Sequence, residues 1–120
     1  MFSTDWIIRQ VETLCQILAK MVFHKELPNY AFPEKGELSE KDELYLTLHG
    51  LLEKGKINEA EDLLFESLAP EDLGYLELAL DFYTVLNHWS DEQLENRGFS
   101  REEIEEGLKD AAKLYEITLP

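Results

Sequence analysis

Cysteine is almost absent from this chain of 120 residues, and the single Cys15 excludes both an intrachain disulfide and a metal site built from several cysteines. Valine and isoleucine are few, and no segment alternates between apolar and polar residues, so β-strands are not expected. The hydrophobic residues, 44% of the chain, are weighted towards leucine and are numerous enough for one core. The composition therefore predicts an all-α protein with a single helical domain over residues 1–120.

Long apolar runs are also missing. No stretch approaches the roughly 20 apolar residues that a transmembrane helix needs, so no membrane contact is expected. Near the N-terminus, Arg9, Gln10 and Glu12 interrupt the apolar segment that a signal peptide would require. Since disulfides are excluded as well, we expect a bacterial, cytoplasmic protein.

Basic side chains are scarce, with 11 Lys and Arg against 26 Asp and Glu and a net charge of −15. Residues 1–60 hold 7 basic and 10 acidic side chains, and residues 61–120 hold 4 and 16, so the two halves carry net charges of −3 and −12. A field of this sign repels phosphate groups and anionic lipids, so no nucleic-acid partner is expected. The simplest interpretation of the excess acid is solubility, and the functional alternative is a basic or amphipathic protein partner.

The positions of apolar and helix-capping residues predict a compact bundle of five to six helices. The predicted helices cover residues 5–24, 39–54, 59–68, 71–88, 91–97 and 100–116. Serine or asparagine followed three residues later by an acidic residue or glutamine predicts a capping box at a helix start. The predicted pairs are Ser39 with Asp42, Asn58 with Glu61, Ser90 with Gln93 and Ser100 with Glu103. Since the helix over 71–88 is apolar on most sides, we expect it at the centre of the fold.

An apolar stripe runs along the first predicted helix, where Ile7, Val11, Leu14 and Leu18 recur at spacings of 4, 3 and 4 residues. In the simplest interpretation the stripe packs on the rest of its own domain. Because the same spacing follows a heptad, a homodimer that pairs two copies of this helix is the functional alternative. These four residues are therefore candidate interaction residues.

The segment over residues 26–38 cannot continue a helix, because two prolines and a glycine interrupt it. A connection of this length needs anchors in a compact domain, and its aromatic residues Tyr30 and Phe32 are the candidates. We expect these side chains either to pin the loop to the core or, if they are exposed, to form a binding hot spot.

The helical hairpin predicted over residues 39–72 resembles one degenerate tetratricopeptide repeat, a helix-turn-helix unit of about 34 residues. The residues that match the repeat's pattern are Leu44, Leu48, Leu51, Gly55, Ala60, Leu64, Ser67 and Pro70. The chain departs from the pattern at Leu44, where the repeat has tryptophan, and no second copy of the unit follows. The resemblance implies a protein-binding role for this hairpin.

Residues 5–12 read Asp-Trp-Ile-Ile-Arg-Gln-Val-Glu, and this opening resembles the start of an uncharacterised family of small helical bacterial proteins. The pattern of that family is Asp, an aromatic residue, two aliphatic residues, Arg, Gln, an aliphatic residue and Glu. The resemblance implies a helical domain and carries no known activity with it.

Three polar side chains share one face of the helix predicted over residues 71–88, since Glu77, Asp81 and His88 lie at offsets of 4 and 7 residues. Carboxylate and imidazole groups bind metal ions, and a histidine such as His88 can act as a general base when an aspartate such as Asp81 orients it. A metal-binding protein or an enzyme is therefore the alternative function. The simpler interpretation is the solvent-facing stripe that any amphipathic helix carries. The sequence contains neither a glycine-rich phosphate-binding loop nor paired cysteines, and neither a cofactor nor catalytic residues are predicted. The favoured function is a non-enzymatic protein-protein interaction or scaffolding domain.

Overall fold

In the computed structural model, which describes residues 4–120, the chain folds into six helices, and that part of the chain contains no strand. The helices are α1 (Asp5–Met21), α2 (Glu40–Glu53), α3 (Ile57–Ser67), α4 (Leu73–Asn87), α5 (Asp91–Asn96) and α6 (Arg101–Leu114). The all-α prediction is therefore confirmed. Within the same residues, none of the helices has the length and apolar character needed to cross a bilayer.

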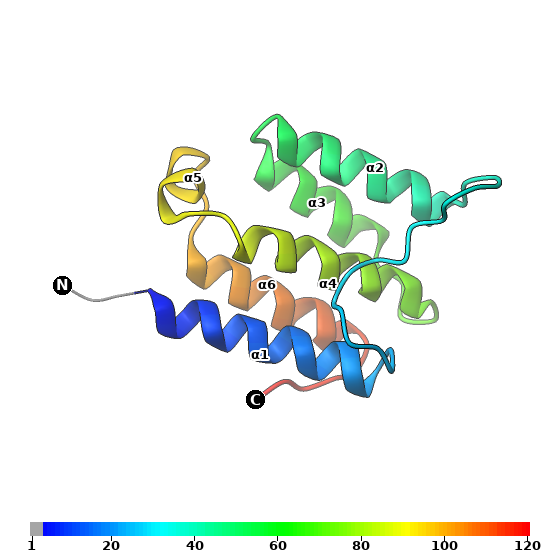
Figure 1. Ribbon diagram of the computed structural model, residues 1–120, viewed down its shortest axis with the longest axis horizontal. Coiled ribbons are helices and arrows are strands. Elements are labelled where there is room, and N and C mark those ends of the chain that lie inside the picture. The colour runs from blue at the N-terminus through cyan, green and yellow to red at the C-terminus, as the bar shows by residue number, and fades with distance from the viewer. Residues whose placement is uncertain (1–3) are drawn as a thin grey trace.

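Helix α4 occupies the centre of the molecule (Figure 1). It packs against α1 and α6 on one side and against the α2–α3 hairpin on the other. Its side chains include Tyr83 and Phe82, the two largest that are fully buried. This position follows from its sequence. A helix that is apolar on most sides removes all of that surface from water only when other helices cover it on every side, as they do at the centre of the fold.

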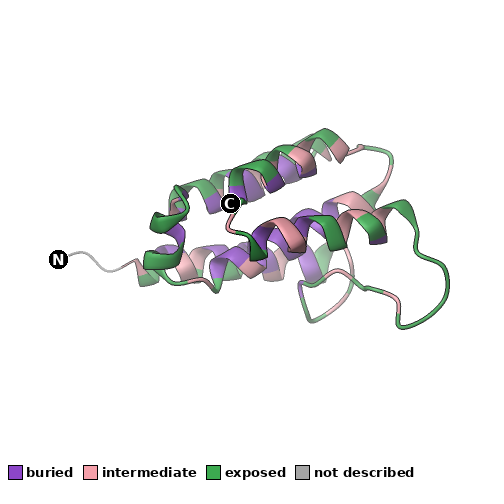
Figure 2. Ribbon diagram, turned by 90° about the horizontal axis from the view of Figure 1, so that it is seen from above, coloured by how far each residue is buried: buried purple, intermediate pink, exposed green. Residues whose placement is uncertain are grey.

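The other long helices are amphipathic and turn their apolar faces towards the interior (Figure 2). The apolar stripe of α1 is buried and contains Ile7, Val11, Leu14 and Leu18. The buried apolar residues of α6 are Ile104, Leu108, Ala111 and Ala112. Since α1, α4 and α6 all contact one another, these stripes meet and enclose one half of the core.

Capping boxes fix the start of three helices. The hydroxyl groups of Ser39, Ser90 and Ser100 each accept a hydrogen bond from the backbone N–H three residues further on. In each case the side-chain oxygen at that third position accepts a hydrogen bond from the serine N–H, so the two residues together satisfy two backbone donors. Three of the four predicted boxes are therefore confirmed.

The fourth predicted box, between Asn58 and Glu61, is wrong. Helix α3 already begins at Ile57, and no side-chain hydrogen bond caps it. Gly55, with φ 76°, closes the end of α2 so tightly that only one residue separates it from the next helix. The early start buries Ile57, which is 1% exposed, and the Glu61 carboxylate bonds to Tyr83 of α4 instead.

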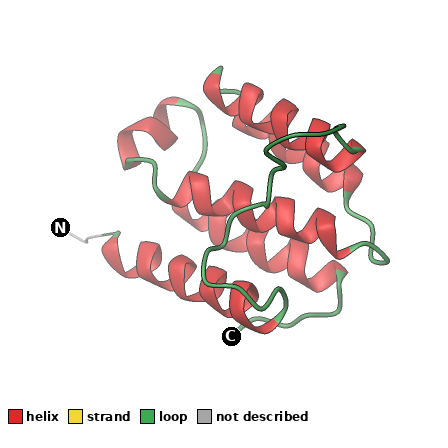
Figure 3. Ribbon diagram, turned by 45° about the vertical axis from the view of Figure 1, so that its right-hand side comes forward, coloured by secondary structure: helices red, strands yellow, loops and turns green. Residues whose placement is uncertain are grey.

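The connection between α1 and α2 crosses the outer surface of α1 and α4 before it reaches α2 (Figure 3). We name its first part, residues 25–31, the strap. Two carboxylates of α4 hold the backbone of the strap. The N–H of Tyr30 donates to Asp81 at 2.9 Å, and the N–H of Ala31 donates to Glu77 at 3.2 Å. These bonds supply the anchors that a long connection needs in a compact fold.

Candidate functional site

Two members of the predicted metal stripe have a structural role. Glu77 and Asp81 hold the strap, and Asp81, only 3% exposed, also lies 2.9 Å from Nε2 of His49. His88 is engaged elsewhere, because its ring Nδ1 lies 2.8 Å from the carbonyl oxygen of Thr84 on its own helix. The three side chains are not brought together, and no three His, Cys, Asp or Glu residues in the described part of the chain form a group able to hold a metal ion.

The apolar residues predicted on the first helix to contact a partner lie in the core instead. Ile7, Val11, Leu14 and Leu18 are 0–2% exposed, which leaves them no surface to offer to a second copy. The physical reason is that α1 needs this stripe to bury itself against α4 and α6. A homodimer through these four residues would require the domain to open.

The aromatic residues of the loop are only partly withdrawn from solvent. The ring of Tyr30 stacks on Tyr45 of α2 with 5.3 Å between centroids, and Phe32, 36% exposed, lies 5.1 Å from the same ring. The Tyr30 hydroxyl donates to Asp42, and this bond lowers the pKa of the carboxyl group. Burial, with the neighbouring carboxylate adding to it, raises the pKa of Tyr30 to about 12. Both rings therefore anchor the loop on α2, while Phe32 keeps an exposed edge.

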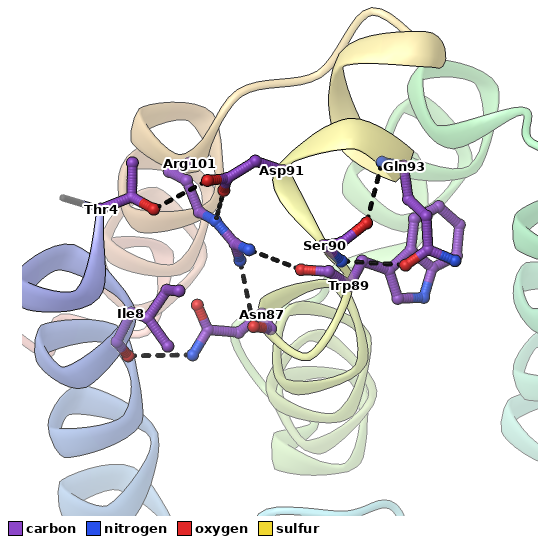
Figure 4. Close-up of polar contacts among 8 residues, drawn as sticks. All are labelled: Thr4, Ile8, Asn87, Trp89, Ser90, Asp91, Gln93 and Arg101. Carbon is purple, nitrogen blue, oxygen red and sulfur yellow. Dashed lines mark hydrogen bonds and ion pairs between the residues drawn. The ribbon is translucent and has the colours of Figure 1, made fainter. Parts of the chain in front are cut away.

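A buried arginine joins the ends of four helices (Figure 4). Arg101, 7% exposed, donates to the backbone carbonyls of Asn87, at 3.0 Å, and of Trp89. Its Nε donates to the Asp91 carboxylate at 2.8 Å, to which the Thr4 hydroxyl also donates, and these bonds lower the pKa of Asp91. The guanidinium satisfies carbonyls at the end of α4 and connects them to the first residues of α1, α5 and α6. Because its donors are engaged within the protein, we regard this junction as structural.

A groove between α3 and α6 is the strongest candidate for a functional surface. Its volume is about 320 Å³. Helix α3 contributes Asn58, Glu61, Asp62 and Phe65, and α6 contributes Glu103, Glu106, Gly107 and Asp110. The two helices run in the same direction along the groove (Figure 1).

Tyr83 reaches this groove from the core. Its ring is fully buried, yet its hydroxyl donates to the Glu61 carboxylate at 2.5 Å. Gly107 makes this approach possible, because a Cβ atom at that position would lie 2.2 Å from the Tyr83 hydroxyl oxygen. Burial raises the pKa of Glu61, and nearby carboxylates, led by Glu103, add to the rise, while the bond from Tyr83 opposes it.

An apolar recess continues the groove beyond its acidic end. The recess has a volume of about 420 Å³ and is lined by Phe65, Asp110, Lys113 and Leu114. Because Phe65 and Asp110 line both spaces, the two are continuous. Leu114, a large apolar side chain, is 47% exposed. We name the whole feature the α3–α6 groove, which is acidic at one end and apolar at the other.

Within the described residues, the negative charge at the acidic end is not balanced by an ion pair. Five carboxylates line it, and within residues 4–120 none of them forms an ion pair. Because like charges repel one another at short range, this end of the groove favours a cationic group. The excess acid of the second half is visible in the sequence, but the groove is not, because only the fold places α3 beside α6.

A family described as Family of unknown function (DUF6483) has a sequence model that matches residues 1–116. No curated protein and no solved structure matches the chain. The α2–α3 hairpin is formed, and its likeness to a tetratricopeptide repeat stays a prediction.

Proposed function

Because the chain belongs to DUF6483, a family of unknown function, its role has to be inferred from its own surfaces, and we propose that it is a non-enzymatic protein-interaction domain. In this proposal the α3–α6 groove binds a basic, amphipathic segment of another protein. The observation that carries the proposal is the combination, in one groove, of five carboxylates that form no ion pair within residues 4–120 and an adjoining apolar recess.

The two ends of the groove suit different side chains of such a segment. Lys or Arg residues of the partner approach the acidic end, where Glu103 and Glu106 are exposed. A large apolar residue of the partner covers Phe65 and Leu114 in the recess. On α6, Glu106 and Glu103 lie 8 and 11 residues before Leu114, which at 1.5 Å per residue is about 12–17 Å. Basic and apolar side chains about two to three turns apart on a partner helix therefore reach both ends.

The alternative functions have less support. The carboxylates of Glu77 and Asp81 would have to leave the strap before they could bind a metal or act in catalysis. A homodimer through the apolar stripe of α1 would expose residues of the core. Nucleic acids and anionic membranes are disfavoured as partners by the net charge of −15.

Capture of partners from an extract of the native cell tests the proposal, with three forms of the immobilised protein. One form is the wild type. The groove variant carries Glu103→Gln, Glu106→Gln and Asp110→Asn, and the control variant carries Glu40→Gln, Glu43→Gln and Glu53→Gln on exposed positions of α2. Both variants lose three negative charges, so total charge is matched and only its location differs.

We expect a basic protein that binds the wild type and the control variant but not the groove variant. Its binding should weaken as salt is added, because salt screens exposed charges. Thermal melting verifies that all three forms are folded, since each exposed substitution should change stability by no more than about 0.5 kcal/mol. If every captured protein binds the groove variant as well as the control variant, the proposal is wrong.

A further inference from the structure

A separate pocket lies between α1, α4 and the strap, on the opposite side of α4 from the α2–α3 hairpin. Its volume is about 380 Å³, within the range of roughly 300–1,000 Å³ that small-molecule sites occupy. Its lining includes Glu12 and Cys15 from α1, Leu27 and Pro28 from the strap, and Val85 and His88 from α4.

The wall formed by the strap is held in place on both sides. On one side the Lys25 ammonium donates to the carbonyl of Asn29 and to Glu77, at 3.0 Å from the latter. On the other side the N–H of Tyr30 donates to the buried carboxylate of Asp81. The segment between these contacts is therefore fixed before any ligand arrives, as in most small-molecule sites.

The inner surface of the pocket is apolar. Cys15 is 2% exposed and Pro28 is buried, while Val85 is half-buried beside them. Burial raises the pKa of the Cys15 thiol to about 11, so this group is neutral at physiological pH. Leu27 is 69% exposed at the edge of the pocket. An apolar ligand body placed here removes part of Leu27 from water.

The charged and ring groups at the edge of the pocket accept hydrogen bonds. Glu12 is an exposed carboxylate. The Nδ1 of His88 must donate to the Thr84 carbonyl oxygen, 2.8 Å away, because a carbonyl oxygen can only accept. In the tautomer that carries its proton on Nδ1, the Nε2 of His88 has a lone pair that can accept. Neither Lys nor Arg is among the residues that line the pocket.

We propose that this pocket binds a small organic cation, an amine joined to a compact apolar body. The body packs on Pro28, Val85 and Leu27, and the ammonium group lies at the edge near the Glu12 carboxylate. The negative field of the whole protein adds to this preference and repels an anion of the same shape. The proposal is independent of the α3–α6 groove, because no residue lines both sites.

Three probes of one shape and different charge test the proposal. They are 2-phenylethylamine, 2-phenylethanol and phenylacetate, each titrated into the ¹⁵N-labelled full chain while backbone amide signals are followed by NMR. We expect the amine to shift the amides of Cys15, Asn29 and Thr84, and to bind about threefold to fivefold more tightly than the alcohol, as an exposed ion pair allows. Phenylacetate should leave these amides unchanged.

Two matched variants separate the edge charge from the general field. Glu12→Gln removes the carboxylate at the pocket and should make the amine bind about as weakly as the alcohol. Glu53→Gln removes one exposed carboxylate from α2 and should preserve the difference. A third variant, Val85→Phe, fills the pocket and should abolish the shifts with every probe. The first two changes are at exposed positions, so the test does not depend on whether Val85→Phe folds.

The proposal fails if the amine shifts none of the pocket amides, or shifts only those of the α3–α6 groove. It also fails if amine and alcohol bind equally to the wild type, or if Glu12→Gln and Glu53→Gln weaken amine binding to the same extent. None of these results bears on partner binding in the α3–α6 groove, which the capture experiment measures by itself.

Discussion

Replacing Gly107 by alanine should destabilise this protein even though alanine is the better helix former. Helix propensity alone would raise the free energy of unfolding by up to about 1 kcal/mol. In this fold, however, the new Cβ atom would lie 2.2 Å from the hydroxyl oxygen of Tyr83 and 2.4 Å from its Cζ atom. The ring is rigid and fully buried, so it cannot turn aside without moving its neighbours in the core.

The size of the effect follows from these two contributions. Overpacking of a core costs about 1–3 kcal/mol, and the upper half of that range applies where several ring atoms are approached this closely. After the gain in propensity, the expected loss is about 1–2 kcal/mol in the free energy of unfolding. Urea denaturation followed by far-UV circular dichroism measures it by linear extrapolation.

A second helical glycine provides the control. At Gly50 of α2 an added Cβ would meet no atom within 4 Å, so Gly50→Ala should stabilise the protein by about 0.5–1 kcal/mol. Adding Tyr83→Phe to Gly107→Ala should recover part of the loss, since the nearest clashing atom is then absent. A Gly107→Ala protein as stable as the wild type would refute the close approach of Tyr83 to α6.

Four further changes have expected outcomes. Arg101→Met should lower the free energy of unfolding by about 2–4 kcal/mol in urea, because two carbonyls at the end of α4 lose their donor. Cys15, whose burial raises its pKa to about 11, should react with a thiol reagent slowly in the native protein and quickly in urea. The pKa of Glu61 is raised in the folded state, so its ionised form destabilises the fold and stability is gained as pH falls through that pKa. Glu61→Gln should therefore gain more stability over the wild type at about pH 7 than at about pH 4. Addition of Mn²⁺, Zn²⁺ or Ca²⁺ should leave the melting temperature unchanged, because Glu77 and Asp81 are bonded to the strap.

Each of these outcomes has a clear opposite. A loss below about 0.5 kcal/mol for Arg101→Met would mean that water replaces the guanidinium at the end of α4. Rapid labelling of native Cys15 would place its thiol at the surface. A pH-independent difference for Glu61→Gln would mean that its charge is fully solvated. A higher melting temperature with one of the metal ions would support a metal site formed by Glu77, Asp81 and His88 of α4.

The helices could be predicted because their signals are local. Ser39, Ser90 and Ser100 start helices where the capping pattern put them, since such a box needs only residues three positions apart. The predicted end of the first helix is too late, because α1 ends at Met21 and His24 adopts a left-handed backbone conformation, φ 55°. Membership of an uncharacterised family, expected from the start of the chain, is confirmed.

Contacts between distant segments could not be predicted in this way. Asp81 reads as part of a solvent-facing stripe, yet the strap and His49 cover it to 3% exposure. The groove brings Glu61 and Glu103 together across two intervening helices, and periodicity within either helix says nothing about that pairing. The repeated spacing on α1 fits burial within the domain, the simpler interpretation, and it also fits burial against a second copy, so the spacing alone does not separate the two.

The junction at Arg101 has a consequence for how the protein opens. Six residues are too few to hold a helix in water, so α5 persists while its capping box, the burial of Leu94 and the contact between Arg101 and Asp91 hold it. In hydrogen-deuterium exchange, its amides should lose protection together and ahead of the central helices. Leu94, 1% exposed, leaves the core each time α5 departs, so water reaches this edge of the core when the packing of Leu94 and the contact between Arg101 and Asp91 are lost together.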